Sequence, residues 1–191
     1  MERMRELTYY VAVSIDGFIA APDGDFSAFP VEGDHMAHLV TEYADAVPSH
    51  VQRAVGIESD NSRFDTVIMG WNTYLPALDE GITSPYAHLK QVVASRSARE
   101  VDPAIELTAD PVATVRRLKE QPGTGIYLAG GGELAGVLID EIDRLVLKLN
   151  PLMLGQGIPL FARVPNAVRR FQRTAVRAFD SGVTLLEFER G

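Results

Sequence analysis

Three consecutive glycines are the part of this sequence best suited to binding a ligand. Gly130, Gly131 and Gly132 follow the short apolar run 126–129, which is typical of a buried strand, and they precede the helix-forming segment 133–139. Glycine has no Cβ, so the backbone can adopt positive φ and a ligand can approach it closely. The free N–H groups at a helix start attract anions. The pattern indicates a phosphate or pyrophosphate site, although a tight turn without a ligand is the alternative interpretation.

Two other predicted strands end in similar turns. The strand 64–70 ends in Gly70 and continues into Trp71-Asn72-Thr73, and the strand 91–97 ends in Ser95-Arg96-Ser97. In open α/β sheets, ligands bind outside the carboxyl ends of the strands. Three such turns can meet one extended ligand, so a nucleotide is favoured.

Strands and helices alternate through the first three-quarters of the chain. The predicted strands are 7–13, 64–70, 91–97, 126–129, 144–151, 171–179 and 183–189. The last two flank Asp180-Ser181-Gly182 and form a predicted hairpin. This order predicts an α/β fold with a mostly parallel sheet and an antiparallel edge.

The helices between these strands carry recognisable start and stop signals. Residues 35–55 have apolar residues at helical spacing, interrupted at Pro48. Pro76 is expected in the first turn of the helix after Gly70. The expected helix caps are Asp34, Asn72 or Thr73, and Asp110, which precedes Pro111.

Composition limits the classes of function. The 191 residues are 46% hydrophobic, which suits one domain spanning residues 1–191. Without cysteine, disulfides and thiolate zinc sites are excluded, and the four histidines show no metal spacing, so no metal is expected. A net charge of −8 disfavours binding to nucleic acid or anionic membranes. Residues 1–6 lack the apolar region of a signal peptide and no apolar stretch is long enough to span a membrane, so a cytoplasmic protein is expected.

The sequence resembles the dihydrofolate reductase superfamily, and within it the small bacterial branch related to the reductase domain of riboflavin biosynthesis, the RibD C-terminal domain. The matching segments, in order, are Ser14–Ala20, Val67–Tyr74, Val92–Arg96, Ile126–Leu134 and Leu154–Phe161. The resemblance implies a dihydrofolate reductase-like three-layer α/β fold, with a mostly parallel central sheet and an antiparallel C-terminal hairpin.

The resemblance also implies NADPH as cofactor. It places these residues at the cofactor: Ala12, Val13, Gly17, Gly70, Trp71, Asn72, Thr73, Ser95, Arg96, Gly130, Gly131, Gly132, Glu133 and Leu134. In this arrangement the three glycines meet the pyrophosphate, Ser95 and Arg96 take the adenosine 2′-phosphate, and the backbone of Ala12 and Val13 lies beside the nicotinamide carboxamide.

Two departures from the family pattern leave alternatives open. Trp71 stands where the family usually has a basic residue that helps to hold the 2′-phosphate. The tryptophan either packs at the helix start or stacks on adenine. Because the usual basic residue is replaced, NADH stays an alternative cofactor. Asp16 is the best catalytic carboxylate candidate by position, and the alternative is a residue of an Asp-Gly turn. The carboxylates that could grip a pterin, namely Glu42, Asp45, Glu58 and Asp60, have no match in the family and are expected at the solvated surface.

The leading hypothesis is an NADPH-dependent reductase that transfers hydride to a small pterin-, pyrimidine- or flavin-like heterocycle. A stand-alone ribosylaminopyrimidine reductase of the riboflavin pathway and a non-catalytic NADPH-binding sensor are the alternatives. The apolar segment Leu154–Phe161, together with the resemblance, predicts a homodimer.

Overall fold

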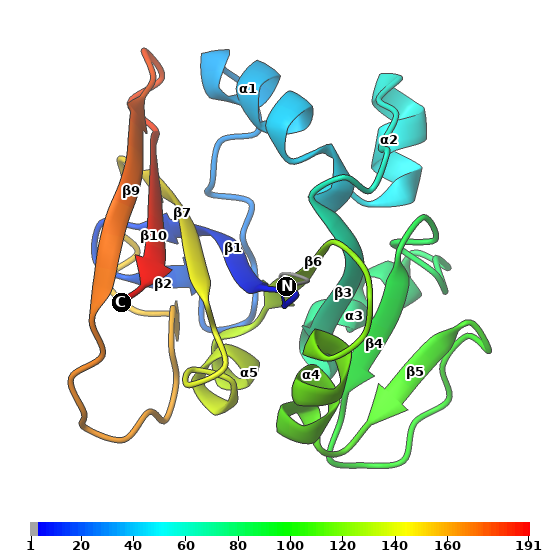
Figure 1. The fold of residues 1–191 in the computed structure, drawn as a ribbon. Helices are drawn as coiled ribbons and strands as arrows, with labels where there is room; N and C mark the ends of the chain where they lie inside the picture. The colour runs from blue at the N-terminus through cyan, green and yellow to red at the C-terminus, as the bar shows by residue number, and fades with distance from the viewer. Residues whose placement is uncertain (1–3) are drawn as a thin grey trace.

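The computed structural model describes residues 4–191 and shows a twisted sheet with helices packed on both faces (Figure 1). Residues 1–3, part of the segment expected to lack a signal peptide, lie outside the described residues. The strands are β1 (Leu7–Ser14), β2 (Phe18–Ala20), β3 (Phe64–Gly70), β4 (Lys90–Ala94), β5 (Ile105–Thr108), β6 (Gly125–Gly130), β7 (Arg144–Asn150), β8 (Ile158–Pro159), β9 (Phe171–Ala178) and β10 (Thr184–Arg190). The helices are α1 (Asp34–Glu42), the short 3₁₀ helix η1 (Ala44–Ala46), α2 (Ser49–Val55), α3 (Trp71–Asp79), α4 (Pro111–Lys119) and α5 (Gly132–Val137).

The main sheet has eight strands in the order β5-β4-β3-β6-β1-β7-β10-β9. The strands from β5 to β7 are parallel, whereas β10 runs antiparallel to both β7 and β9. The remaining pair, β2 and β8, forms a separate two-stranded sheet. The predicted mostly parallel sheet with an antiparallel C-terminal hairpin is therefore confirmed, and the strand β5 is an addition that the sequence did not indicate.

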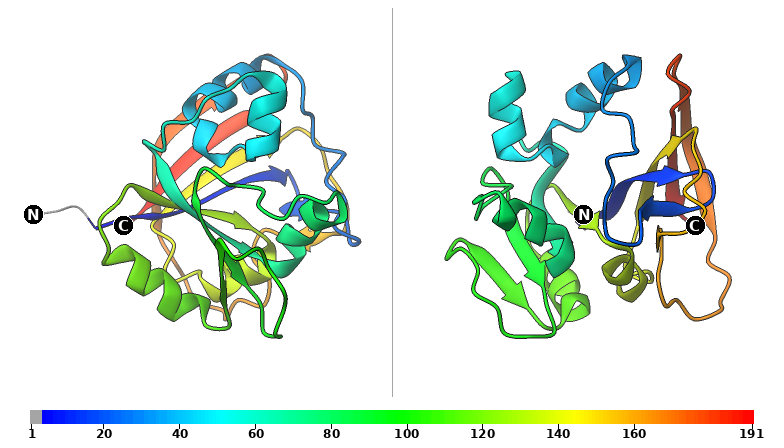
Figure 2. Two further views of the ribbon diagram at one scale, coloured as in Figure 1. Left: turned by 90° about the vertical axis from the view of Figure 1, so that its right-hand side faces the viewer. Right: turned by 180° about the vertical axis from the view of Figure 1, so that it is seen from behind.

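Successive side chains along each strand point to opposite faces of the sheet, and each face has its own hydrophobic core. On one face, Tyr10 and Val146 pack with residues of α1 and α3 such as Leu39 and Tyr74. On the other face, the sheet packs against α4 and α5. The views in Figure 2 show helices on both sides of the sheet. The three-layer arrangement follows from the period-two burial of the strands, since each strand contributes to both cores.

Of the three expected helix caps, Asp110 is confirmed, whereas Asp34 and the pair Asn72 or Thr73 are not the caps of their helices. Asp110 caps α4, its carboxylate accepting a hydrogen bond from the N–H of Ala113 at 3.0 Å. The helix α3, however, begins at Trp71 with Gly70 as its N-cap and no side-chain cap. Asn72 and Thr73 lie within its first turn, where they cannot cap the helix, and Pro76 lies inside the helix instead of in its first turn.

The region 34–55 differs from expectation at its start. Gly33 is the N-cap of α1, and Asp34 makes no capping bond. The Asp34 carboxylate instead accepts hydrogen bonds from the N–H groups of Asp180 and Ser181 at 2.8 and 3.0 Å, which ties α1 to the tip of the β9–β10 hairpin. The expected break at Pro48 is present, since Pro48 precedes α2.

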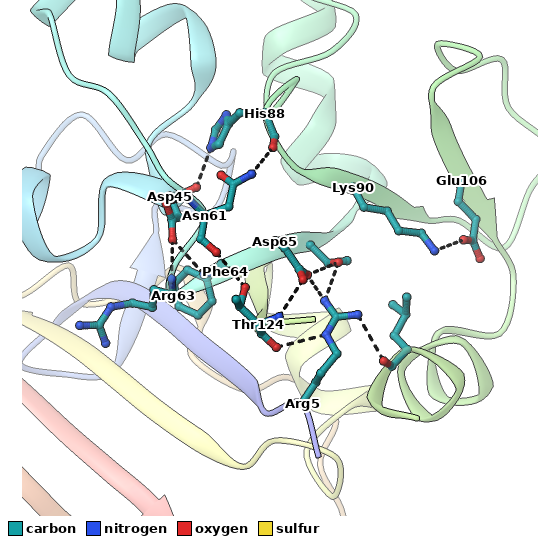
Figure 3. Close-up of polar contacts among 12 residues, drawn as sticks. Arg5, Asp45, Asn61, Arg63, Phe64, Asp65, His88, Lys90, Glu106 and Thr124 are labelled. Atoms are coloured by element: carbon teal, nitrogen blue, oxygen red, sulfur yellow. Dashed lines mark hydrogen bonds and ion pairs between the residues drawn. The ribbon is translucent and has the colours of Figure 1, made fainter. Parts of the chain in front are cut away.

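Asp45 corrects a prediction, because it is a buried anchor and not a solvated surface carboxylate. Its two oxygens accept hydrogen bonds from the N–H groups of Asn61, Arg63 and Phe64 at 2.8 to 3.0 Å (Figure 3). The hydroxyl of Ser59 donates a further hydrogen bond to the carboxylate. The carboxylate thereby fixes the loop that leads into β3. These bonds join η1 to the start of the central strand, which positions the helical layer over the sheet.

Candidate functional site

The three predicted ligand-binding turns lie at one edge of the sheet. β4, β3, β6 and β1 are consecutive and parallel, so their carboxyl ends point the same way. In register, Gly70 faces Ala94 on β4, and Met69 faces Gly130 on β6. The glycine turn therefore stands next to the Gly70 turn, and the turn that contains Ser95 follows on the other side.

Gly130, which is buried, and Gly131, which is half-buried, leave space beside their backbone, and we call this turn the glycine cradle. Gly130 has a φ of 117°, a conformation that favours glycine. Among the described residues, a Cβ on Gly130 or Gly131 would meet only the hydroxyl of Thr73 within 4 Å, at 3.9 and 3.6 Å. Gly70 lies against the cradle, since a Cβ there would be 3.7 Å from the Gly130 carbonyl oxygen. The uncapped start of α3 and the cradle thus adjoin each other.

Gly132 and Leu134 have a different environment from the cradle. A Cβ on Gly132 would clash with the carbonyl oxygen of Pro159, and its own carbonyl accepts a hydrogen bond from the N–H of Ala162 at 2.9 Å. The side chain of Leu134 is buried in the core. Packing explains both residues, so any ligand contact they make is through the backbone.

Arginines flank the cradle. The carboxylate of Glu133 lies 3.8 Å from the Arg96 guanidinium and 3.0 Å from that of Arg163, and the arginine side chains are 84% and 75% exposed. The side chains are free to turn towards an anion, because exposed ion pairs are weak. No sequence pattern indicates Arg163, which reaches Glu133 from a loop 30 residues further along the chain.

Trp71 combines packing with a charge contact. Its ring meets Tyr74 edge-on at 5.8 Å and packs on the core beneath α3. The Arg99 guanidinium lies 4.8 Å from the centroid of the Trp71 ring. The stack holds a cation close to the position at which the family usually has a basic side chain. Ser95 bonds within its own turn, to the N–H and carbonyl of Ser97.

Asp16 joins two loops. Its carboxylate accepts hydrogen bonds from the Ser14 hydroxyl at 2.6 Å and from the N–H groups of Leu154 and Gly155 at 3.2 and 2.7 Å. The hydrogen bond from Ser14 is the largest influence lowering the Asp16 pKa. The group is therefore held as an anion, and the structure gives it a role in fixing the loop that contains Gly17. A proton-donating role does not suit this environment.

The predicted nicotinamide end carries small side chains on the α1 face of the sheet. Ala12 and Ala129, both with small half-buried side chains, lie near the ends of β1 and β6. Lys148 on β7 is the direct neighbour of Ala12 in the pairing of β1 with β7. The sequence reasoning missed Lys148, since a lysine within a strand usually points to solvent.

Two surface hollows lie away from the cradle. One, of about 440 Å³, is at the opposite edge of the sheet and is lined by residues such as Arg5, Asp143 and Gly191. The other, of about 410 Å³, lies between His38 of α1 and the β9–β10 hairpin. Within residues 4–191, no cluster of three or more His, Cys, Asp or Glu side chains could hold a metal ion.

The fold and the edge with its glycine cradle define a dihydrofolate reductase-like protein. The family model of the RibD C-terminal domain matches residues 5–185, so the chain belongs to that family, which is a family of reductase domains. No helix in the described part of the chain is long and apolar enough to cross a membrane.

Individual relatives agree with the family. The uncharacterized protein YwjB of Bacillus subtilis strain 168 is 29% identical over 172 residues, covering 86% of this chain and 87% of the relative. A solved structure described as a candidate riboflavin biosynthesis protein, from Shewanella sp. PV-4, has a TM-score of 0.70 at 21% identity and covers 97% of this chain and 99% of its own.

A larger bifunctional protein shares the fold. The diaminohydroxyphosphoribosylaminopyrimidine deaminase/5-amino-6-(5-phosphoribosylamino)uracil reductase of Thermotoga maritima has a TM-score of 0.69 at 16% identity. The match covers all of this chain but 58% of that protein, so the present chain spans little more than half of its length.

Proposed function

We propose that the protein is an NADPH-dependent reductase that transfers hydride to a small heterocyclic substrate. The observation that carries the proposal is the glycine cradle, where Gly130 and Gly131 leave space for a ligand beside Thr73 and the uncapped start of α3. Backbone N–H groups that are free of side-chain cover are suited to a pyrophosphate.

The remaining cofactor contacts follow from the order of the strands. The pyrophosphate would contact the cradle and Thr73. The 2′-phosphate would bind Arg96, and Arg99 and Arg163 would lie nearby as further positive charges. A guanidinium forms paired hydrogen bonds with phosphate oxygens, which favours NADPH over NADH. Bound NADPH would supply the hydride.

The protein would contribute position and shelter to the reaction. In this proposal a planar ring would lie between the sheet and α1, beside the small side chains of Ala12 and Ala129. The loop that contains Gly17 is held by Asp16, so it can keep water from that space without itself being loose. Orientation and exclusion of water are what a protein adds to cofactor chemistry.

The substrate class that the family supports best is a ribosylaminopyrimidine. The matching family is that of the RibD C-terminal domain, and the Thermotoga protein is named as a reductase of such a compound. Pterins and flavins have similar planar, polar rings and belong in the same substrate panel.

The protein also acts as a homodimer in this proposal. The edge strand β9 is exposed along nearly its whole length, and Val176 in its centre is 50% exposed. A long exposed edge with an apolar residue is suited to pairing with a second copy. Light scattering at micromolar concentration should give twice the monomer mass, and a monomer mass would contradict the dimer.

Calorimetry with NADPH and NADH tests the cofactor proposal. Gly131→Ala should weaken binding of both cofactors about tenfold or more, because its Cβ would enter the cradle while its φ of −91° suits alanine. Arg96→Ala should weaken NADPH and leave NADH unchanged. The control Arg53→Ala, at an exposed position on α2, should change neither affinity.

The outcomes separate the alternatives. If the wild-type protein binds neither cofactor, the reductase and the sensor hypotheses are both wrong. If NADPH binds but is not oxidised with pterins, flavins or 5-amino-6-(5-phosphoribosylamino)uracil, a binding module is indicated and the enzyme is not.

A further inference from the structure

Lys148 is a cation placed at the expected hydride-transfer position. In the sheet, Lys148 faces Ala12 on β1 and Leu185 on β10. Its side chain is on the same face as those of Tyr10 and Val146, which is the face covered by α1. The backbone of Ala12 is where the nicotinamide carboxamide is expected, so the ammonium group belongs to the same space as the reacting ring.

The surroundings of the ammonium group are aromatic and not acidic. The Lys148 Nζ atom lies 4.3 Å from the centroid of the Tyr10 ring, which is itself stacked on Tyr43 at 4.4 Å. The other lysines, Lys90 and Lys119, form ion pairs with acidic side chains, whereas no such pair involves Lys148 within residues 4–191. An aromatic face stabilises the ammonium without holding its proton.

The charged groups on the elements around Lys148 are engaged with other partners. They are Arg144 of β7, Glu187 of β10, Arg177 of β9, and His35 and His38 of α1, with the phenols of Tyr10 and Tyr43. Glu187 bonds to the Tyr43 hydroxyl and to Arg144, and Arg177 lies over the Phe179 ring. His35 bonds to Ser181, and the His38 ring lies 5.6 Å from the Phe179 ring. Burial of the ammonium, with no compensating charge, lowers the Lys148 pKa to about 8.

We propose that Lys148 Nζ donates the proton that completes reduction of a carbon–nitrogen double bond in the substrate. This inference rests on the proposed reductase function. The substrate carbon gains the hydride from the reduced nicotinamide, the π electrons move to the substrate nitrogen, and that nitrogen takes the proton from Lys148. The amine of Lys148 then regains a proton from water, so the net change is one hydride and one proton added to the substrate.

A binding experiment that needs no substrate tests the position of Lys148. NADP⁺ carries a positive charge on its nicotinamide ring that NADPH lacks, and the two are otherwise alike. A nearby ammonium should disfavour NADP⁺ until it loses its proton. The affinity for NADP⁺ should therefore rise about tenfold relative to that for NADPH between pH 7 and pH 9.

Variants assign this pH dependence. Lys148→Met should remove it, whereas Lys90→Met, a matched control at an exposed position, should retain it. Unchanged pH dependence in Lys148→Met would overturn the inference while leaving the reductase function intact. Absence of binding of either cofactor to the wild-type protein would instead contradict the proposed function, and the inference with it.

Kinetics with 5-amino-6-(5-phosphoribosylamino)uracil distinguish proton donation from simple charge. Lys148→Met should lower kcat about 100-fold with little change in KM. Lys148→Arg keeps the charge but holds its proton too tightly to donate it, so it should not restore kcat. Recovery of the wild-type rate and pH profile by Lys148→Arg would overturn the proton-donor role.

Discussion

Removing the Asp45 carboxylate should strongly destabilise the protein without affecting the glycine cradle. Asp45 is 3% exposed, and it accepts hydrogen bonds from the three backbone N–H groups of Asn61, Arg63 and Phe64 (Figure 3) and from one hydroxyl. A hydrogen bond to a charged group contributes about 1.5–3 kcal/mol, and a buried donor left unpaired costs about 1–3 kcal/mol. Water can replace part of the loss at the loop, so we expect Asp45→Ala to lower the free energy of unfolding by about 3–5 kcal/mol.

Asp45→Asn refines the test. An amide has one acceptor oxygen, which can retain the bonds to Arg63 and Phe64, while its NH₂ group faces the remaining donors. We expect a loss of about 1–2 kcal/mol for this variant. The control is Asp60→Ala, since Asp60 is exposed and its carboxylate accepts local bonds from Ser62, including one from the N–H group at 3.0 Å. The change there should be within about 0.5 kcal/mol.

Urea unfolding measures all three variants. The midpoint should fall in the order Asp60→Ala, Asp45→Asn, Asp45→Ala, with an unchanged slope if the unfolded state is unaffected. The NADPH affinity of the folded variants should equal that of the wild type, because Asp45 lies at the start of β3 and the cradle lies beside its end. A loss below about 1 kcal/mol for Asp45→Ala would refute the reasoning, since it would mean that solvent fully replaces the carboxylate.

Three further predictions concern the site. Gly132→Ala should destabilise the protein by about 1–3 kcal/mol, because its Cβ would displace Pro159, whereas Gly131→Ala should cost little; thermal unfolding compares the two, and equal effects would contradict the packing argument. The pKa of Asp16 is lower in the folded protein than its value of 3.8 in the unfolded chain. The ionised carboxylate therefore contributes its full stabilisation above pH 3.8 and loses it as the pH falls through the pKa of the folded state. Asp16→Asn should accordingly show a shallower acid unfolding profile than the wild type. Lys148 has a pKa near 8 in the folded protein against 10.5 in the unfolded chain, so it binds fewer protons when the protein is folded. Lys148→Met should therefore be more stable than the wild type at pH 7 by roughly 1–3 kcal/mol, and the wild type should gain stability relative to this variant between pH 8 and pH 10.5. A constant difference in stability across that pH range would argue against a lowered pKa.

The strands were predictable from sequence because burial repeats along them. Segments such as 64–70 and 144–150 are apolar and bounded by turns, and both are strands as predicted. β5 was missed because its four residues include two that are polar, which gives too short a pattern to detect. The helix caps were less predictable, since Asp34 has a tertiary partner in the β9–β10 hairpin that no local pattern indicates.

The glycine turns of the candidate site could be located from sequence because they depend on backbone at the ends of strands. Gly70 and Gly130 adjoin each other once the strand order is known, and glycine runs mark such turns. The side chains that complete the site could not be found in this way. Arg163 and Lys148 owe their significance to neighbours far away in sequence, Glu133 and Tyr10, and only the fold brings each pair together.

The seam between α5 and the segment 157–162 has a consequence for how this family can diversify. Gly132 and Gly136 lie against the carbonyl groups of Pro159 and Ala162, and Gly157 lies against that of Ala20. The contacts join backbone to backbone, so they do not depend on which side chains the segment carries. Sequence drift or laboratory evolution can therefore exchange the outward side chains of this segment, as long as the glycines and the length of the segment are kept. Such exchanges would change the side chains on this part of the surface without changing the backbone packing.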